Sequence, residues 1–253
     1  SVKIIIIVEN IYKFILVKKN SFIFESVEKG TIRGRYTIIG FNPDKIYNIK
    51  KNQIIEDNFK KKKLIKKNVL KYLNELLKNF KVKTSKGIPK MSSMLVGYFS
   101  YDIIRLIEKI PDKCKNDIDI PDIRLTRPKN LIIYDNILKK IFFVENIFRD
   151  EKINDYTTKY TSIKKTFAEL ENFGQIKLPE NFHKNSKKIE IKSNITKAKF
   201  KKNVVTAKKY IKKGDIFQVV LSQRFEAAID KPPLEIYNTL RLLNPSPFMF
   251  YFN

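Results

Sequence analysis

The sequence is poor in the residues that form several common kinds of functional site. Its 253 residues include one cysteine, Cys114, one histidine, His183, and only seven glycines. A single cysteine cannot form an internal disulfide bond, which fits a reducing cytoplasm. The glycines do not form the Gly-rich strand-to-helix pattern, ending in Lys-Ser/Thr, that cradles phosphates. His183 lies in a polar segment rich in Lys and Asn, so we interpret it as a solvated side chain.

Long apolar runs are also missing. The run from Ile4 to Val8 suits a strand and is much shorter than a membrane-spanning helix. No signal-peptide pattern is present, and 43% of the residues are hydrophobic. We therefore expect a soluble, cytoplasmic protein with no membrane partner. It is long enough to bury a substantial core in one large domain or two smaller ones.

Acidic residues are scarce relative to basic ones. The formal net charge of +26 would by itself suggest a nucleic-acid or anionic-membrane partner. However, the basic residues are 44 Lys and only 8 Arg, beside 38 Ile and 22 Asn, which is the composition that A/T-rich codons produce. The lysines are scattered along the chain and lack regular aromatic interleaving. We expect no nucleic-acid partner, although the charge could steer an anionic substrate.

The few glycines indicate local backbone conformations. Gly30 and Gly34 predict turns with positive φ, and Gly97, inside an expected strand, predicts a close approach of two backbones. Gly214 predicts a left-handed cap at the end of a helix whose N-cap is Thr196.

Strands and helices are expected without regular alternation, which favours an α+β fold over a doubly wound sheet. We expect antiparallel-rich sheets with flanking helices. Alternating apolar residues between polar turns predict strands at 3–8, 13–17, 22–27, 35–40, 45–49, 53–56, 94–101, 131–134 and 140–145, the last two as a hairpin. Helical spacing of apolar residues predicts helices over 63–80, 102–108 and 155–172.

The last part of the chain has the densest pattern. Residues 216–225 alternate with period two and become polar on one face, which predicts a long strand. That strand is either an ordinary buried strand with a solvated end or one that ends at a ligand cleft. A helix follows from Pro232-Pro233 to Leu243, and the prolines at 245 and 247 must end it. This corner is either a stiff turn or a rigid backbone whose unpaired polar groups meet a small zwitterion.

Three motifs occur in an order that resembles a known family. They are FESVEKGTIRGRYTIIGFNP at 24–43, LVGYFSYDIIRLIEKIP at 95–111, and GDIFQVVLSQRF at 214–225 followed by LRLLNPSPFMFYF at 240–252. Together they resemble the chorismate-utilising enzymes, most closely component I of anthranilate synthase. The resemblance covers most of the chain and is weak at 1–20, in the Lys-rich middle and near Asn181. It implies an incomplete chorismate-binding-enzyme fold.

The resemblance also implies a pocket for tryptophan, the feedback inhibitor of the pathway. The residues that match its lining are Ser26, Pro247, Phe248 and Met249. Ser26 offers a hydroxyl, the 247–249 backbone offers fixed carbonyls to an ammonium group, and the two apolar side chains offer surface to an indole. Glu25 could add a carboxylate for the ammonium. From the residues alone, a strand-end hydroxyl and core packing would be the simpler interpretation.

Two positions in these motifs depart from the family pattern. Phe24 stands where the family usually has Leu, and Phe248 stands where it usually has Tyr. The second change removes a phenolic hydroxyl. It would weaken inhibitor binding if that hydroxyl makes a hydrogen bond, whereas a backbone contact would survive.

The domain organisation is likewise implied by the resemblance. Residues 1–173 would form an N-terminal regulatory domain like that of anthranilate synthase component I, 174–193 a linker, and 194–253 the start of the chorismate-binding catalytic domain. The family's chain is considerably longer, and its residues for chorismate and Mg²⁺ lie beyond the position of Asn253. We therefore expect a fragment that is inactive alone, with no catalytic residue and no metal ligand in it.

The whole enzyme implied by the resemblance is a lyase of tryptophan biosynthesis. It converts chorismate and ammonia into anthranilate and pyruvate with Mg²⁺, and a glutamine amidotransferase partner subunit supplies the ammonia. Three alternatives remain at this point. They are the aminodeoxychorismate synthase component of the folate pathway, which keeps the pyruvyl group, a non-catalytic tryptophan-binding module, and a nucleic-acid-binding protein.

Overall fold

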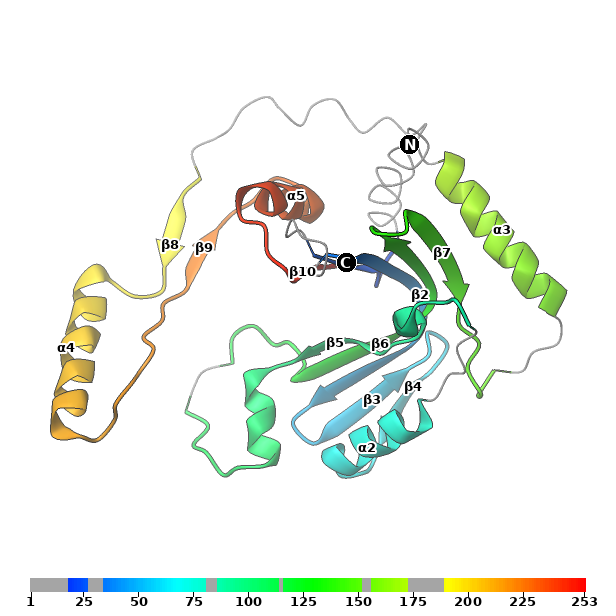
Figure 1. Ribbon diagram of the computed structural model, residues 1–253. Helices are drawn as coiled ribbons and strands as arrows, with labels where there is room; N and C mark the ends of the chain where they lie inside the picture. Colours follow the sequence, from blue (N-terminus) through cyan, green and yellow to red (C-terminus); the bar gives the residue numbers. More distant parts are fainter. Residues whose placement is uncertain (1–17, 27–33, 81–85, 114–115, 152–155, 173–188) are drawn as a thin grey trace. The chain divides into compact units, whose positions relative to one another are not determined.

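The computed structural model describes residues 18–26, 34–80, 86–113, 116–151, 156–172 and 189–253 (Figure 1). The expected strands at 3–8 and 13–17, as well as Gly30, Cys114 and His183, lie outside these ranges. The chain divides into two compact units, residues 1–176 with 237–253 and residues 177–236. The domain boundaries expected near 173 and 194 stay a prediction, and most of the expected linker lies outside the described residues.

The first unit is built on an eight-stranded sheet. Two long strands, β2 (Tyr36–Lys50) and β6 (Ile123–Asp135), pair along most of their length, from Tyr36 opposite Asp135 to Ile49 opposite Ile123. The other strands are β1 (Phe22–Glu25), β3 (Gln53–Asp57), β4 (Lys62–Ile65), β5 (Val96–Phe99), β7 (Lys140–Glu145) and β10 (Met249–Phe252). The described strand pairs are all antiparallel, which confirms the expected α+β class.

Each end of the β2–β6 pair carries its own set of strands. At one end β1 and then β10 extend the sheet from β2, and β7 extends it from β6. At the other end β3 and then β4 extend it from β2, and β5 extends it from β6. The hairpin expected between β6 and β7 is confirmed, since Asp135 pairs with Lys140. The expected strand at 131–134 is only part of β6.

A bulge replaces the break that the sequence suggested in β2. We expected two strands, 35–40 and 45–49, but the chain continues as one strand whose register with β6 shifts between Pro43 and Lys45. Proline cannot donate to a strand ladder and is tolerated at bulges. Asn42 has a φ of +48°, a conformation that Asn adopts more readily than most residues.

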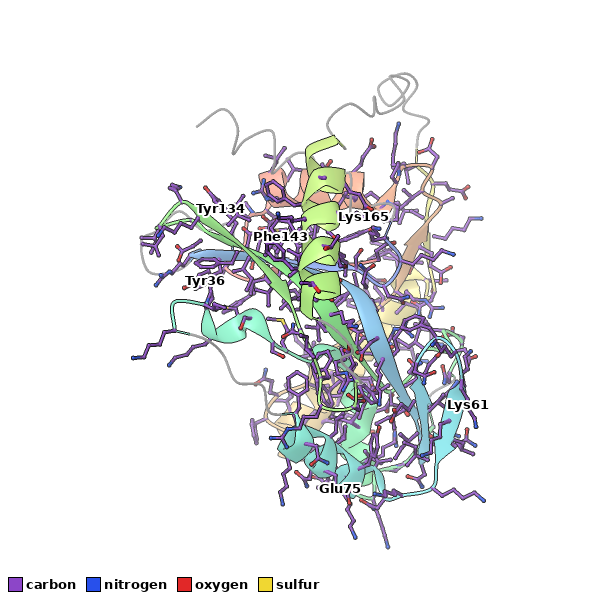
Figure 2. The ribbon with its side chains drawn as sticks, turned by 90° about the vertical axis from the view of Figure 1, so that its right-hand side faces the viewer. Tyr36, Lys61, Glu75, Tyr134, Phe143 and Lys165 are labelled. Carbon is purple, nitrogen blue, oxygen red and sulfur yellow. The ribbon has the colours of Figure 1, made fainter. Side chains whose placement is uncertain are left out.

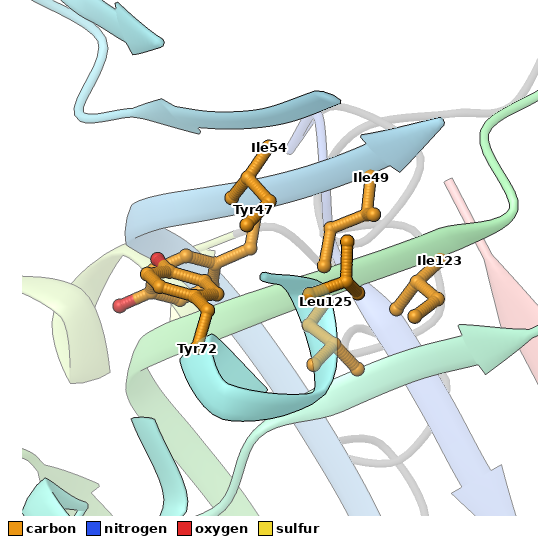
Figure 3. Close-up of a cluster of buried hydrophobic side chains, with 7 residues drawn as sticks. Tyr47, Ile49, Ile54, Tyr72, Ile123 and Leu125 are labelled. Atoms are coloured by element: carbon orange, nitrogen blue, oxygen red, sulfur yellow. The ribbon is translucent and has the colours of Figure 1, made fainter. Parts of the chain in front are cut away.

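Helix α2 (Val69–Asn79) covers the sheet at the β3 end. Its N-cap is Asn68, whose Oδ1 accepts a hydrogen bond from the Lys71 amide at 3.1 Å. It buries Tyr72 against Tyr47, with ring centroids 6.4 Å apart, in the cluster drawn in Figure 3. The helix expected over 63–80 was therefore too long, because Lys62–Ile65 forms β4 on the edge of β3 instead.

Helix α3 (Tyr156–Asn172) matches the helix expected at 155–172 and lies along β7. The ring of Phe143 on β7, labelled in Figure 2, meets the ring of Phe167 on α3 edge-on. The two ring centroids lie 5.5 Å apart. Lysine side chains such as Lys61 project into solvent in the same view. The helix expected at 102–108 is a short 3-10 helix, Tyr101–Leu106. A second short 3-10 helix spans Lys90–Ser92.

The second unit contains α4 (Lys197–Lys213) and a two-stranded sheet of β8 (Ile191–Ser193) and β9 (Phe225–Ala227). Both predicted caps of α4 are confirmed, because Thr196 accepts from the Lys199 amide and Gly214 has a φ of +80°. The long strand predicted at 216–225 is wrong. Phe217 is 96% and Val220 81% exposed, and no described strand pairs with them. An apolar alternating segment needs a neighbouring strand before it becomes a strand itself.

Helix α5 (Pro233–Leu243) begins in the second unit and ends in the first. It confirms the helix predicted after Pro232-Pro233, and it leads through the proline corner into β10. Within the described residues, none of the helices is both long and apolar enough to cross a membrane.

Candidate functional site

The pairing of β1 with β10 joins the beginning of the described chain to its end. In this antiparallel pair Glu25 lies opposite Met249, and Phe24 lies opposite Phe250. Ser26 follows Glu25, and Phe248 precedes Met249, so both stand at the same end of the two strands. The structure therefore brings the expected site residues Ser26, Pro247, Phe248 and Met249 together.

The corner before β10 is fixed by its own local chemistry. The Asn244 amide donates to the Leu240 carbonyl at 2.8 Å and closes the last turn of α5. Pro245 and Pro247 have no amide hydrogen to continue a helix. The Phe248 amide instead donates to Ser246 Oγ at 3.3 Å, and the chain then enters β10. The corner is thus a stiff connection between a helix and a strand.

The side chains of β1 and β10 point alternately to two faces. One face is buried, with Glu25 5% and Met249 7% exposed. The other face is open at this end, because Phe248 is 86% and Phe250 63% exposed. Ser26 directly follows β1 and Phe248 directly precedes β10, so the two residues flank the same end of the strand pair.

The hydroxyl of Ser26 has unused hydrogen-bonding capacity. Its Oγ is inaccessible to solvent and has no hydrogen-bond partner among the residues that the structure describes, a property it shares with Ser93 and Ser100. An unsatisfied buried hydroxyl costs free energy, about 1 to 3 kcal/mol. Ser26 differs from the other two serines in its position beside the 247–249 corner, where a ligand could pair with it.

The carboxylate of Glu25 is already bound by other side chains of the protein. Its Oε1 accepts a hydrogen bond from the Tyr237 hydroxyl at 2.6 Å and lies 2.9 Å from Nε of Arg241. The carboxylate that the sequence offered for a ligand ammonium is thus compensated by α5. Tyr237 and Arg241 were not among the residues expected at the site. Their spacing of four residues, which puts both on one helix face, was the available signal.

A cavity of about 380 Å³ lies elsewhere, where β2, β3 and α2 meet. Four of its charged groups, Lys45, Glu56, Arg127 and Asp150, are already paired. Lys45 contacts Glu56 at 2.6 Å and Asp150 at 2.9 Å, and Arg127 contacts Asp150 at 3.1 Å. None of the expected site residues lines this cavity. We interpret it as part of an ion-pair network that stabilises the fold.

The charges of this network are held firmly. Burial alone would raise the pKa of Asp150, but hydrogen bonds from Lys45 and Arg127 outweigh it and lower the pKa to about 2. Burial likewise opposes the charge of Lys45, and its hydrogen bonds to Glu56 and Asp150 still raise its pKa. Burial raises the pKa of Tyr47 to about 12. These groups keep one charge state near neutral pH, so they are poorly suited to proton transfer there.

This network predicts a stability change in acid. The folded state holds the pKa of Asp150 at about 2, below the ordinary value of an unfolded Asp, roughly 3.9. Its contribution is therefore complete above about pH 4 and disappears as the pH falls towards 2. We expect the free energy of unfolding of Asp150→Asn to fall less steeply than that of the unmodified protein between these pH values, as measured by urea titration. Equal slopes would contradict the assignment, and the exposed Asp230→Asn serves as the control.

The described carboxylates do not form a metal site. No group of three or more His, Cys, Asp or Glu side chains that could hold a metal ion exists within the described ranges. We derive no metal-dependent step from the described residues.

Comparison with a family profile and comparison with individual proteins indicate the same kind of relative for this chain. The profile of the chorismate binding enzyme family matches residues 19–253. Anthranilate synthase component 1 of Acetivibrio thermocellus is 34% identical over 91% of this chain and 48% of the relative. That of Aquifex aeolicus is 34% identical over 91% of this chain and 47% of the relative. The chain thus spans about half the length of the curated relatives it matches.

A solved structure shows the same likeness. The crystal structure of anthranilate synthase component I from Streptococcus pneumoniae superimposes with a TM-score of 0.69 at 26% sequence identity. The match covers 86% of this chain and 47% of that structure. The described fold is therefore the fold of part of that protein.

Proposed function

Because this chain belongs to the chorismate-binding enzyme family, we propose that it forms the regulatory part and the first catalytic segment of an anthranilate synthase component I. The names of its relatives support this activity, and so do the three motifs in their shared order. The domain boundaries near 173 and 194 are part of the proposal. The competing aminodeoxychorismate synthase shares the opening chemistry, but the QVVLSQRF motif at 218–225 favours anthranilate synthase.

The proposed whole enzyme converts chorismate and ammonia into anthranilate, pyruvate and water. A partner subunit releases the ammonia from glutamine, and Mg²⁺ binds the carboxylate of the substrate. It is part of the proposal that this chain alone is inactive, because it spans only about half the length of its relatives. What this chain contributes is control of the enzyme.

That control rests on one observation, the pairing of Glu25 with Met249. The proposal is supported by Ser26, which follows Glu25 and whose Oγ has no hydrogen-bond partner within the described residues. A free tryptophan fits this chemistry, because its indole can pack on Phe248 and its polar groups can pair with the Ser26 hydroxyl and the corner carbonyls. Since the corner continues into β10, an occupied site would bias the position of that strand. This is how inhibition would reach the rest of the enzyme.

The activity is tested by assaying the full-length protein that contains this chain, with chorismate, ammonium and Mg²⁺. Equal amounts of anthranilate and pyruvate are expected, measured by anthranilate fluorescence and a coupled pyruvate assay. Consumption of chorismate without release of pyruvate would instead assign the protein to the aminodeoxychorismate branch. Tryptophan binding without any turnover of chorismate would favour a non-catalytic binding module.

A further inference from the structure

A buried carboxylate links the first strand of the sheet to helix α5. Glu25 lies on β1 with its side chain only 2% exposed. The Tyr237 hydroxyl donates to it at 2.6 Å from within the core, where Tyr237 is 6% exposed. Arg241, one turn further along α5, places Nε 2.9 Å from the same oxygen. A buried charge is tolerated only when it is paired in this way.

The same helix carries the corner of the proposed site. α5 ends at Leu243, and a short connection leads from it to β10, which begins at Met249. The 247–249 corner is the last part of this connection together with the first residue of β10. The corner is therefore held at both ends, by the Glu25 contacts of α5 on one side and by the β1–β10 ladder on the other. The rings of Tyr237 and Tyr251, with centroids 5.8 Å apart, also join the helix to the strand.

We propose that Tyr237 and Arg241 are positioning residues of the amino-acid site. By holding α5 on Glu25, they fix the 247–249 corner at the distance from Ser26 at which a tryptophan can touch both. This inference rests on the proposed function. It assigns to Glu25 the role of an anchor for α5 rather than that of a ligand for the ammonium group.

Glu25 is compensated in two ways, by a hydrogen bond from Tyr237 and by an ion pair with Arg241. The Tyr237 hydroxyl satisfies the carboxylate in the dry interior, whereas Arg241 approaches from the surface, with 38% of its side chain exposed. Hydrogen bonds to a charged acceptor are stronger than neutral ones. A ligand that needs the corner in one place is bound less tightly when the corner can move, because its binding then has to order the corner as well.

The first test compares tryptophan inhibition in the full-length enzyme with Tyr237→Phe, Arg241→Met and Tyr210→Phe. Tyr210, on α4, is 50% exposed. Tyr210→Phe removes the same hydroxyl group as Tyr237→Phe, but from an exposed side chain, so it is the matched control. We expect each α5 variant to raise the half-inhibitory tryptophan concentration about tenfold, with no shift for Tyr210→Phe. In a Glu25→Gln background the Tyr237→Phe effect should largely vanish, because the two residues act as one unit.

A purely structural role would lower the melting temperature and leave the half-inhibitory concentration unchanged. An inhibited wild-type enzyme whose α5 variants keep its half-inhibitory concentration would overturn the inference. A wild-type enzyme that tryptophan neither binds nor inhibits would instead overturn the proposed inhibitor site.

The second test needs no ligand and uses this chain alone. Amide hydrogen exchange in β10 should accelerate about tenfold in Tyr237→Phe, while exchange in α2 stays unchanged. Unaltered exchange in β10 would show that Tyr237 does not anchor the corner. This result decides the anchoring role whatever the enzyme assay shows.

Discussion

Replacing Arg127 with Met should lower the free energy of unfolding by about 3 kcal/mol. Arg127 is only 8% exposed, and its Nε donates to Asp44 at 2.8 Å while Nη2 donates to Asp150 at 3.1 Å. Its guanidinium also lies 4.0 Å from the centroid of the Phe148 ring. Met fills similar space but leaves the Asp44 carboxylate without its guanidinium partner.

Urea unfolding followed by tyrosine fluorescence measures this change, because the chain has 12 tyrosines and no tryptophan. The matched control is Lys67→Met. It breaks a surface pair with Glu75 whose two side chains are 48% and 39% exposed, and we expect no measurable change. Equal effects of the two substitutions would show that the Arg127 network is no more important than a surface ion pair.

Replacing Gly97 with Ala should be at least as damaging, with a loss of about 3 kcal/mol or more. A Cβ built at Gly97 would lie 1.8 Å from the carbonyl oxygen of Arg124 and 2.8 Å from its carbonyl carbon. Both atoms belong to the backbone of β6, which cannot rotate away as a flexible side chain could. Strand β5 must therefore separate from β6 at this point.

Hydrogen exchange of the β5 and β6 amides shows whether the strands separate. We expect lost protection where Gly97 pairs with Leu125, together with a lower urea midpoint. Phe99→Ala in the same strand is the control, because Phe99 is 52% exposed and its truncation removes little buried surface. Full protection of β5 in Gly97→Ala would mean that the close approach is absent.

Local rules accounted for a substantial part of the fold. The Thr196 and Gly214 caps, the β6–β7 hairpin and the tight packing at Gly97 each depend on one or two residues whose stereochemistry allows few alternatives. The antiparallel class followed from the absence of regular strand–helix alternation.

Other features depend on residues that are distant in the sequence. Lys62–Ile65 has the apolar spacing of a helix start, but the free edge of β3 makes it a strand. Residues 216–225 have the pattern of a strand, and the described chain supplies no edge for them to pair with. A local sequence pattern limits which secondary structures a segment can form. The elements that neighbour the segment in the fold determine which of them it adopts.

The candidate site likewise has parts that the sequence motifs predict and parts that depend on residues distant in the sequence. The motifs identified Ser26 and the 247–249 corner, and the strand ladder places them side by side. The anchor could not be foreseen, because Glu25 and Tyr237 are separated by 212 residues. Glu25 in an apolar strand was nevertheless a signal, since a buried carboxylate requires a partner. Tyr237 and Arg241 provide it from one face of α5.

The central claim, that Ser26 and the 247–249 corner form one site for a free amino acid, is tested most directly by the fluorescence anisotropy of L-tryptophan titrated with this chain. The chain contains no tryptophan, so the indole signal belongs to the ligand alone. We expect a saturable rise in anisotropy, an affinity about tenfold weaker for Ser26→Ala, and no change for Ser93→Ala, which removes a hydroxyl that is equally unpaired within the described residues. A folded chain that leaves the anisotropy at its free value, or a Ser26→Ala variant that binds as tightly as the unmodified chain, would contradict the claim.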